Sequence, residues 1–264
     1  MTTSVSRTQL APSLRRAGNG LVNSYVVDDG GQVTIIDAGM PGQYADLLRE
    51  LAAMGRSISD VRAVVLTHGD TDHVGFAERL RREHGVPVFV HALDADRARM
   101  LVRKPSMGWG PIRLRPFASF MLYGARKGGL RAVPVTELRT FDDGATLDVP
   151  GSPRIVHVPG HTPGSVAVHV PTVGALFVGD ALTTHDVLTG ADGPRLAPFT
   201  IDRAMALDSL ARLDAIEATW VLPGHGQAWG GGVQAAIRSA REAAWAAGAA
   251  GTAGAAGTAG RRHS

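Results

Sequence analysis

Cysteine is absent from all 264 residues of this chain. Its absence excludes disulfide bonds, thiolate metal ligands, thiol nucleophiles and redox dithiols. Histidine, aspartate and glutamate remain as strong metal ligands, so any catalytic chemistry must rely on oxygen and imidazole groups. The composition, 44% hydrophobic and 19% charged, excludes a wholly disordered chain.

Long apolar runs are also missing, and none approaches the roughly 20 residues that a membrane span needs. Residues 1–18 contain Arg7, Arg15 and Arg16 with no apolar run after them, unlike a secretory signal. We therefore expect a flexible N-terminal segment over residues 1–18 and a cytoplasmic location. Because residues 246–260 are only alanine, glycine and threonine, we expect a disordered tail over 247–264.

Positive charge is concentrated in one segment, residues 97–131, which has nine basic residues and no acidic one. The rest of the chain has 18 basic and 24 acidic residues, a net charge of −6. Because this remainder is acidic and shows no separate phosphate-binding motif, we expect no nucleic-acid partner.

Short β-rich runs alternate with amphipathic helical stretches between the two ends of the chain. The strands form two groups, one before and one after the basic segment, and each group is mixed with helices. This order predicts two sheets packed on each other with helices outside, in a single domain over residues 19–246. The predicted strands are Leu21–Val27, Val33–Ile36, Val61–Leu66, Val86–Val90, Arg154–Val158, Ser165–Val170, Ala175–Val178 and Trp220–Leu222.

Potential metal ligands follow several of these strands. The segment THGDTDH places His68, Asp70, Asp72 and His73 directly after a buried strand. Three later strands are followed by His161 in GHTPGS, Asp180 in VGDA and His225 in LPGHG, each ligand preceded by a glycine that permits a sharp turn. Buried imidazoles and carboxylates need a compensating charge, which a metal supplies.

These motifs, together with TIIDAG at residues 34–39, resemble the metallo-β-lactamase fold superfamily of hydrolases. The resemblance implies a four-layer αββα sandwich with two divalent metal ions at one edge. Position by position, it implies that His68 and His161 bind the first metal and that Asp72, His73 and His225 bind the second. It makes Asp180 the carboxylate that bridges them, and Asp37 a buried group that orients ligands.

One position departs from the family's usual motif, His-x-His-x-Asp-His, because Asp70 replaces the second histidine. With two divalent ions and a hydroxide, the third carboxylate changes the formal charge of the site from +1 to zero. A neutral, harder site favours iron or manganese more than an imidazole-rich one does. Zinc remains the first expectation, with iron or manganese as alternatives. Another interpretation makes Asp70 a surface turn residue that leaves the first metal weakly bound.

The predicted activity is hydrolysis of a small-molecule ester, thioester, lactone or related bond. Two metal ions supply a bridging hydroxide that attacks the substrate. The resemblance implies that Asp72 is also the catalytic residue, accepting a hydrogen bond from the bridging water. An alternative is an iron-containing oxidoreductase, flavodiiron-like or dioxygenase-like, on the same fold. Another is a degenerate, non-catalytic binding protein.

The basic segment permits three interpretations: a helical insertion packed on the core, a lid over the metal edge, or a helix touching an anionic membrane. Of these, membrane contact is the least favoured. A lid would suit an anionic or amphiphilic substrate, because guanidinium groups bind carboxylate or phosphate. Candidate pocket residues are Trp109, Phe120, Tyr123 and His185. The other histidines, including His84 at the end of a helix expected over Val74–His84, are expected to be structural.

Overall fold

The computed structural model describes residues 8–102 and 110–259, with side chains up to residue 247. Within this part of the chain, the larger of two main sheets has seven strands in sequence order, antiparallel from β1 to β4 and parallel from β4 to β7. Its strands are β1 (Gln9–Ala11), β2 (Leu14–Gly18), β3 (Asn23–Asp29), β4 (Gln32–Ile36), β5 (Val61–Val65), β6 (Val88–His91) and β7 (Arg139–Phe141).

The second main sheet has four described strands in the order β13-β10-β9-β8. Strands β11 and β12 form a separate two-stranded sheet. The strand bounds are β8 (Arg154–His157), β9 (Val166–Val170), β10 (Ala175–Gly179), β11 (Thr183–His185), β12 (Asp192–Arg195) and β13 (Trp220–Pro223). Strands β10 and β13 are parallel, and their C-terminal ends therefore lie side by side.

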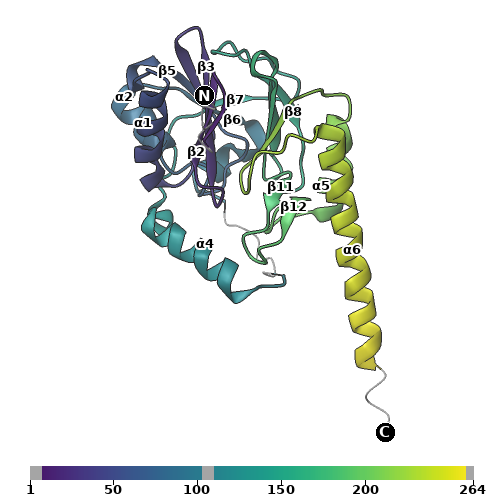
Figure 1. The fold of residues 1–264 in the computed structure, drawn as a ribbon. Helices are drawn as coiled ribbons and strands as arrows, with labels where there is room; N and C mark the ends of the chain where they lie inside the picture. Colours follow the sequence, from purple (N-terminus) through teal and green to yellow (C-terminus); the bar gives the residue numbers. More distant parts are fainter. Residues whose placement is uncertain (1–7, 103–109, 260–264) are drawn as a thin grey trace, which may run out of the picture.

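Helices cover both outer faces of the paired sheets. Figure 1 shows α1 and α2 on one side of the strands and α5 and α6 on the other. The helices are α1 (Tyr44–Ala53), α2 (Ala77–His84), α3 (Ala95–Ala98), α4 (Leu114–Arg126), α5 (Arg203–Ser209) and α6 (Val233–Ala259). The 3-10 turns are η1 (Pro41–Gln43), η2 (Ile58–Asp60), η3 (Ala92–Asp94), η4 (Gly129–Arg131), η5 (Pro171–Val173) and η6 (Leu210–Leu213).

Three apolar cores separate these layers. The central core lies between the sheets and includes Tyr25, whose ring packs edge-on to Phe177 with centroids 5.2 Å apart. A second core includes Leu47 of α1 and Leu80 of α2, and a third includes Leu210 beside α5. These four layers confirm the predicted αββα sandwich.

The predicted flexible segment over residues 1–18 is wrong for its described part. Strand β2 pairs with β3, and Arg15 and Arg16 are buried. Their guanidinium groups have distant acceptors: Arg15 Nε lies 2.6 Å from a Glu50 carboxylate oxygen, and Arg16 Nη1 lies 2.8 Å from Gln227 Oε1. Two adjacent arginines do not suggest a buried strand in the sequence, because the acceptors that allow their burial come from remote parts of the chain.

The structure also differs from the predicted disordered tail over residues 247–264. The backbone of α6 is helical to Ala259, and residues 260–264 lie outside the described part. Alanine has the highest helix propensity of any residue, which the expectation based on low complexity did not include.

Glu78 of α2 ties this helix to the segment that follows the basic insertion. Its carboxylate accepts hydrogen bonds from Arg81 Nε and Nη2 at 2.9 and 2.8 Å. It also accepts bonds from the backbone N–H and hydroxyl of Thr136 at 3.1 and 3.0 Å. The Arg81 bond is the largest of the effects that together lower the pKa of Glu78 from 4.5 to about 2, against the opposing effect of burial.

We expect Glu78→Gln to remove a pH-dependent part of the stability. Because the folded-state pKa lies below the unfolded value, this contribution is present above pH 4.5 and is lost as pH falls toward 2. The variant should be less stable at pH 7 by about 2 kcal/mol, allowing for solvent screening. Urea unfolding from pH 7 down to 2 measures the difference, and a difference independent of pH would contradict the assignment.

Candidate metal centre

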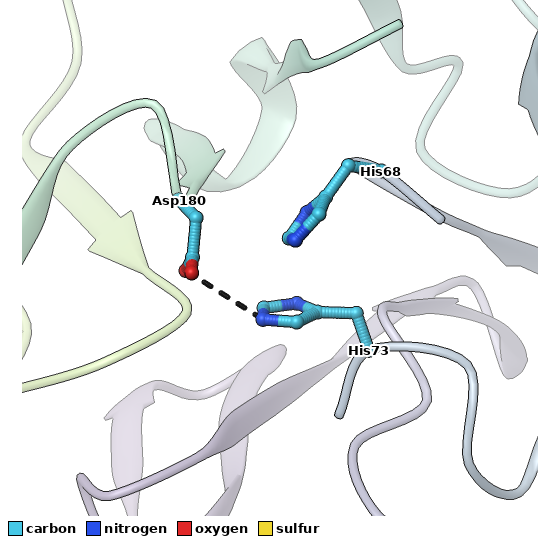
Figure 2. A group of neighbouring side chains, drawn as sticks. All are labelled: His68, His73 and Asp180. Atoms are coloured by element: carbon cyan, nitrogen blue, oxygen red, sulfur yellow. Dashed lines mark ion pairs between the residues drawn. The ribbon is translucent and has the colours of Figure 1, made fainter. Parts of the chain in front are cut away.

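Seven predicted ligands meet where strands of both sheets end. Three loops after β5, β10 and β13 and the β8–β9 loop each bring at least one of them to this edge. The side chains are those of His68, Asp70, Asp72, His73, His161, Asp180 and His225. Figure 2 shows His68 and His73, from the loop after β5, and Asp180, from the loop after β10, directed at one another. The loops that carry these side chains are far apart in the sequence. The packing of the two sheets brings them together in space.

The ligand atoms fall into groups in which all members lie within 4.8 Å of one another. One group contains His68, Asp70 and His161, another contains Asp72, His73 and His225, and a third contains His68, His73 and Asp180. The second group is the set that the resemblance implies for the second metal, and the first group adds Asp70 to the implied pair His68 and His161.

Asp180 lies between these two sets. Its Oδ1 atom is 3.5 Å from His73 Nε2, the contact dashed in Figure 2. Its Oδ2 atom is 3.7 Å from His161 Nε2 and 3.1 Å from His225 Nε2. This position suits a carboxylate shared by two cations.

Asp37 fixes the rings of His73 and His68 by their Nδ1 atoms. Its Oδ2 atom accepts a hydrogen bond from His73 Nδ1 at 2.9 Å. The Thr67 hydroxyl donates to the same carboxylate at 2.8 Å, so its oxygen can accept from His68 Nδ1 at 3.0 Å. Both rings are thereby held through Nδ1 with Nε2 directed at the cluster, where an unprotonated Nε2 would present its lone pair to a metal.

The other two rings are anchored in the same way. The Thr200 hydroxyl donates to the Ala197 carbonyl at 2.8 Å and thus accepts from His161 Nδ1 at 3.3 Å. His225 Nδ1 donates to the backbone carbonyl of Leu21. Four imidazoles therefore present the same nitrogen, Nε2, to one centre.

Unsatisfied polar atoms test whether the residues fit a metal. His68 Nε2, His73 Nε2 and Asp180 Oδ1 are buried, and none has a hydrogen-bond partner in the described part of the chain. Buried polar atoms without partners cost free energy unless another group compensates them. The donor set of imidazole nitrogens and carboxylate oxygens fits zinc, iron or manganese.

The pKa values follow from burial and from neighbouring charges. Burial lowers the pKa of His68 well below its usual value, and the imidazoles of His73 and His161 lower it further, so this ring is neutral. Burial also lowers the pKa of His73, but the carboxylates of Asp37 and Asp180 outweigh it and raise the value to about 10. A cation that binds His73 at neutral pH must therefore displace a proton.

Asp70 is buried inside the cluster, so the alternative of a surface turn residue is wrong. Its Oδ1 atom accepts a hydrogen bond from Arg97 Nε at 2.5 Å, and its Oδ2 atom lies 3.3 Å from His161 Nε2. Asp72 is more accessible, with 21% of its side chain exposed, and lies 3.6 Å from His225 Nε2. Asp72 is thus better placed than Asp70 to meet an incoming molecule.

A glycine is required beside the cluster at Gly224. A Cβ atom there would lie 2.3 Å from Asp180 Oδ1 and 2.4 Å from His73 Cε1, too close for any side chain. The first glycine of the LPGHG motif is therefore needed for lack of space as well as for the turn.

Sequence reasoning missed Asp94, which is fully buried behind the first ligand set. One carboxylate oxygen accepts from the Gly69 N–H and the Thr162 hydroxyl, both at 2.8 Å. The other accepts from the Gly164 N–H at 2.8 Å. Asp94 thus joins the loops that carry His68 and His161. Its only sequence signal is its position shortly after a strand, which no motif marks.

Thr162 and Ser165 lie in the turn that carries His161. Ser165 Oγ accepts a hydrogen bond from the Thr162 N–H at 3.0 Å, and the two hydroxyl oxygens lie 2.7 Å apart. Both residues therefore stabilise this turn.

The predicted pocket residues divide between different environments. Phe120 of α4 packs edge-on to His225, with ring centroids 6.0 Å apart. Burial raises the pKa of Tyr123, and its hydroxyl has no hydrogen-bond partner among the described residues. His185 bonds Asp192 at 2.7 Å and lines a separate pocket of about 210 Å³. Trp109 lies outside the described residues.

The remaining described histidines lie outside the cluster. His84 Nε2 is 3.0 Å from the Tyr44 hydroxyl, and His91 stacks on His157 with centroids 4.4 Å apart. Burial lowers the pKa of His169, whose Nε2 atom has no hydrogen-bond partner in the described part of the chain.

Comparisons with known proteins agree with this geometry. Residues 17–225 match the model of the metallo-beta-lactamase superfamily. The chain belongs to this superfamily, as the motifs suggested, and it carries candidate metal-binding residues.

Three proteins illustrate the relationship. The chain is 32% identical to an uncharacterized protein of Mycobacterium tuberculosis over 223 residues, covering 80% of this chain and 88% of the relative. It is 25% identical to the probable metallo-hydrolase YflN of Bacillus subtilis over 202 residues, 73% of this chain and 74% of the relative. Among solved structures, TTHA1623 in a di-iron-bound form is 26% identical, with a TM-score of 0.56 over 89% of this chain and 98% of that one.

Proposed function

We propose that this protein is a dinuclear metal-dependent hydrolase that cleaves an ester, thioester, lactone or related bond in a small molecule. The observation that carries the proposal is the convergence of four imidazoles, each anchored through Nδ1, with three carboxylates at one sheet edge. Its similarity to a probable metallo-hydrolase supports the same class of reaction.

The residues would hold two divalent ions, zinc before iron or manganese. His68, Asp70 and His161 would bind one ion, Asp72, His73 and His225 the other, and Asp180 both. Bound there, the ions would supply an activated water and polarise the substrate carbonyl. Asp72, the most exposed of the three clustered carboxylates, would accept a hydrogen bond from that water.

Helix α4 supports the interpretation of the basic segment as a lid. At one end, the Arg113 N–H donates to the Leu188 carbonyl at 2.9 Å. At the other end, the Gly42 N–H donates to the Lys127 carbonyl at 2.8 Å, and Lys127 Nζ lies 2.7 Å from Asp46. The helix thus connects both halves of the fold, and its Phe120 reaches His225.

A cavity of about 590 Å³, whose lining includes the Thr200 that contacts His161, supports an anionic, partly apolar substrate. Its lining includes the apolar side chains of Leu188, Leu196 and Phe199, and the guanidinium groups of Arg195 and Arg203. None of the seven clustered side chains lines the cavity, and the contact of Thr200 with His161 Nδ1 is its connection to the first ligand set. An acyl or aromatic group would pack on the apolar side chains, while a carboxylate or phosphate would bind arginine.

Metal analysis followed by hydrolysis assays tests this function. We expect about two divalent ions per chain and chelator-sensitive turnover on a panel of chromogenic esters, lactones, phosphodiesters and a β-lactam. Purified protein without metal, or turnover unaffected by chelator, would contradict the proposal.

The cavity makes a separate prediction. Replacing Arg195 and Arg203 together by alanine should raise KM for a nitrophenyl ester of a dicarboxylic acid at least ~10-fold, since a charge-assisted hydrogen bond contributes about 1.5–3 kcal/mol. Steady-state kinetics should show an unchanged KM for a neutral ester of the same length. The control is Arg212→Ala, which removes an exposed arginine paired with Asp143. Equal effects on both esters would refute a role in charge recognition.

Two observations favour a second candidate, an iron-dependent oxidoreductase. Asp70 adds a hard oxygen ligand, and one similar protein has been solved in a di-iron-bound form. Iron-dependent oxygen uptake by the iron-loaded protein, without hydrolysis of the panel, would support this candidate over the hydrolase.

A further inference from the structure

Arg97 was counted above with the basic segment, but the structure places it at the metal centre. It belongs to α3, and its side chain is 9% exposed. Its Nε atom donates to Asp70 Oδ1 at 2.5 Å, and both partners are buried. A buried charge of this kind is stable only with a partner, and Asp70 is the partner that the structure shows.

The two oxygens of the Asp70 carboxylate face different groups. Oδ1 faces Arg97, whereas Oδ2 lies 3.3 Å from His161 Nε2 and 3.9 Å from His68 Nε2. The oxygen on the side of the first ligand set is therefore Oδ2. Oδ1, held by Arg97, corresponds to the anchored Nδ1 of a histidine ligand, and Oδ2 corresponds to the Nε2 that faces the metal.

The pair also changes the charge of the site. A third carboxylate beside two divalent ions and a hydroxide brings the formal charge to zero, whereas the guanidinium of Arg97 restores it to +1. This is the value for the usual motif, in which a neutral histidine occupies the position of Asp70. The pair as a whole is neutral, as that imidazole would be.

We propose that Asp70 and Arg97 act as one unit that replaces the imidazole of the usual motif, with Arg97 as a positioning residue that orients Asp70 and offsets its charge. The inference rests on the proposed metal site. It assigns Arg97 a role in metal binding, and it weakens the expectation that Asp70 alone shifts the site toward iron or manganese.

A double-mutant cycle over Asp70→His and Arg97→Met tests whether the two residues are coupled. Asp70→His alone leaves a buried guanidinium beside an imidazole and cations. It should reduce the zinc content, measured by mass spectrometry after reloading and dialysis, from about two ions to about one per chain. Adding Arg97→Met should restore about two ions, because the double variant carries the usual neutral ligand and no unpaired charge.

Arg97→Met alone gives an independent readout. With Asp70 uncompensated, the site becomes more anionic, and the stronger attraction for a cation should outweigh the lost orientation of Asp70. Calorimetric titration should therefore show at least ~10-fold tighter Mn²⁺ binding than in the unmodified protein. Thermal unfolding of the metal-free form should show a lower Tm. The matched control is Arg99→Met, which removes the nearby arginine that pairs with Asp96 at 3.4 Å and should change neither quantity.

The outcomes separate this inference from the proposed function. If the unmodified protein binds no metal, both fail. If it binds metal but Arg97→Met has the same effect with aspartate or histidine at position 70, only the coupling is refuted. If Arg97→Met does not fold, the double variant, which removes the whole ion pair, still decides the question by its metal content.

Discussion

Asp180→Asn will abolish most metal binding and turnover while leaving the protein folded. The carboxylate of Asp180 lies between both ligand sets, within 3.7 Å of His73, His161 and His225. The imidazoles around it hold its pKa well below the usual range although burial raises it, so the group is anionic. Asparagine keeps the shape and removes the shared negative charge.

The expected size of this effect follows from the stabilisation that the site would provide. A metal site contributes several kcal/mol of transition-state stabilisation, so a loss of about 4 kcal/mol corresponds to roughly 10³-fold in kcat/KM. Metal content should fall to one ion per chain or fewer. The control Asp214→Asn removes an exposed carboxylate and should leave both quantities unchanged. Full metal loading with unchanged turnover in Asp180→Asn would refute the assigned role.

Asp37→Ala will weaken both the fold and the metal centre. The lost carboxylate accepts hydrogen bonds from the Thr67 N–H at 2.7 Å, the Thr67 hydroxyl and His73 Nδ1. Leaving these buried donors without an acceptor should lower the free energy of unfolding by about 3 kcal/mol, or the Tm by roughly 6–12 °C. Metal affinity should fall about 10- to 100-fold, because the His73 ring loses its anchor.

Asp37→Asn separates backbone strain from lost hydrogen bonds. Asp37 has a φ of 59°, in the left-handed region that asparagine tolerates better than alanine. The asparagine variant should therefore recover part of the Tm, yet still lose metal affinity because its amide cannot accept all of the same bonds. Calorimetric metal titration and thermal unfolding measure the two effects. Unchanged metal affinity in both variants would exclude Asp37 as a group that orients ligands.

The layered fold and the convergence of ligands were predictable because they depend on local patterns. A strand followed by a ligand, as in VGDA with its Asp180, can be identified from a few neighbouring residues. The pairing of parallel strands such as β10 and β13 then brings separate signals to one edge. The motif order thus contained most of the candidate site.

The missed features depend on partners that are distant in the sequence. The charge of Arg97 is visible in the sequence, but its burial against Asp70 is not, so it was counted with the insertion. Asp94 has no motif because its acceptor role depends on two loops that meet only in the fold. Strand β2 was missed because the acceptors of its arginines come from elsewhere.

None of the helices in the described part of the chain combines the length and the apolar character that crossing a membrane requires. The large exposed apolar side chains include those of Leu114 and Leu122 of α4, the helix of the proposed lid.

The attachment of α4 at its two ends has a practical consequence for engineering. Its anchors at Leu188 and Gly42 use backbone hydrogen bonds, and none of the seven clustered side chains belongs to it. The residues of α4, Leu114–Arg126, can therefore be exchanged as a unit. Libraries that vary positions of α4, beginning at Phe120, would sample new substrate preferences while the seven clustered side chains stay the same.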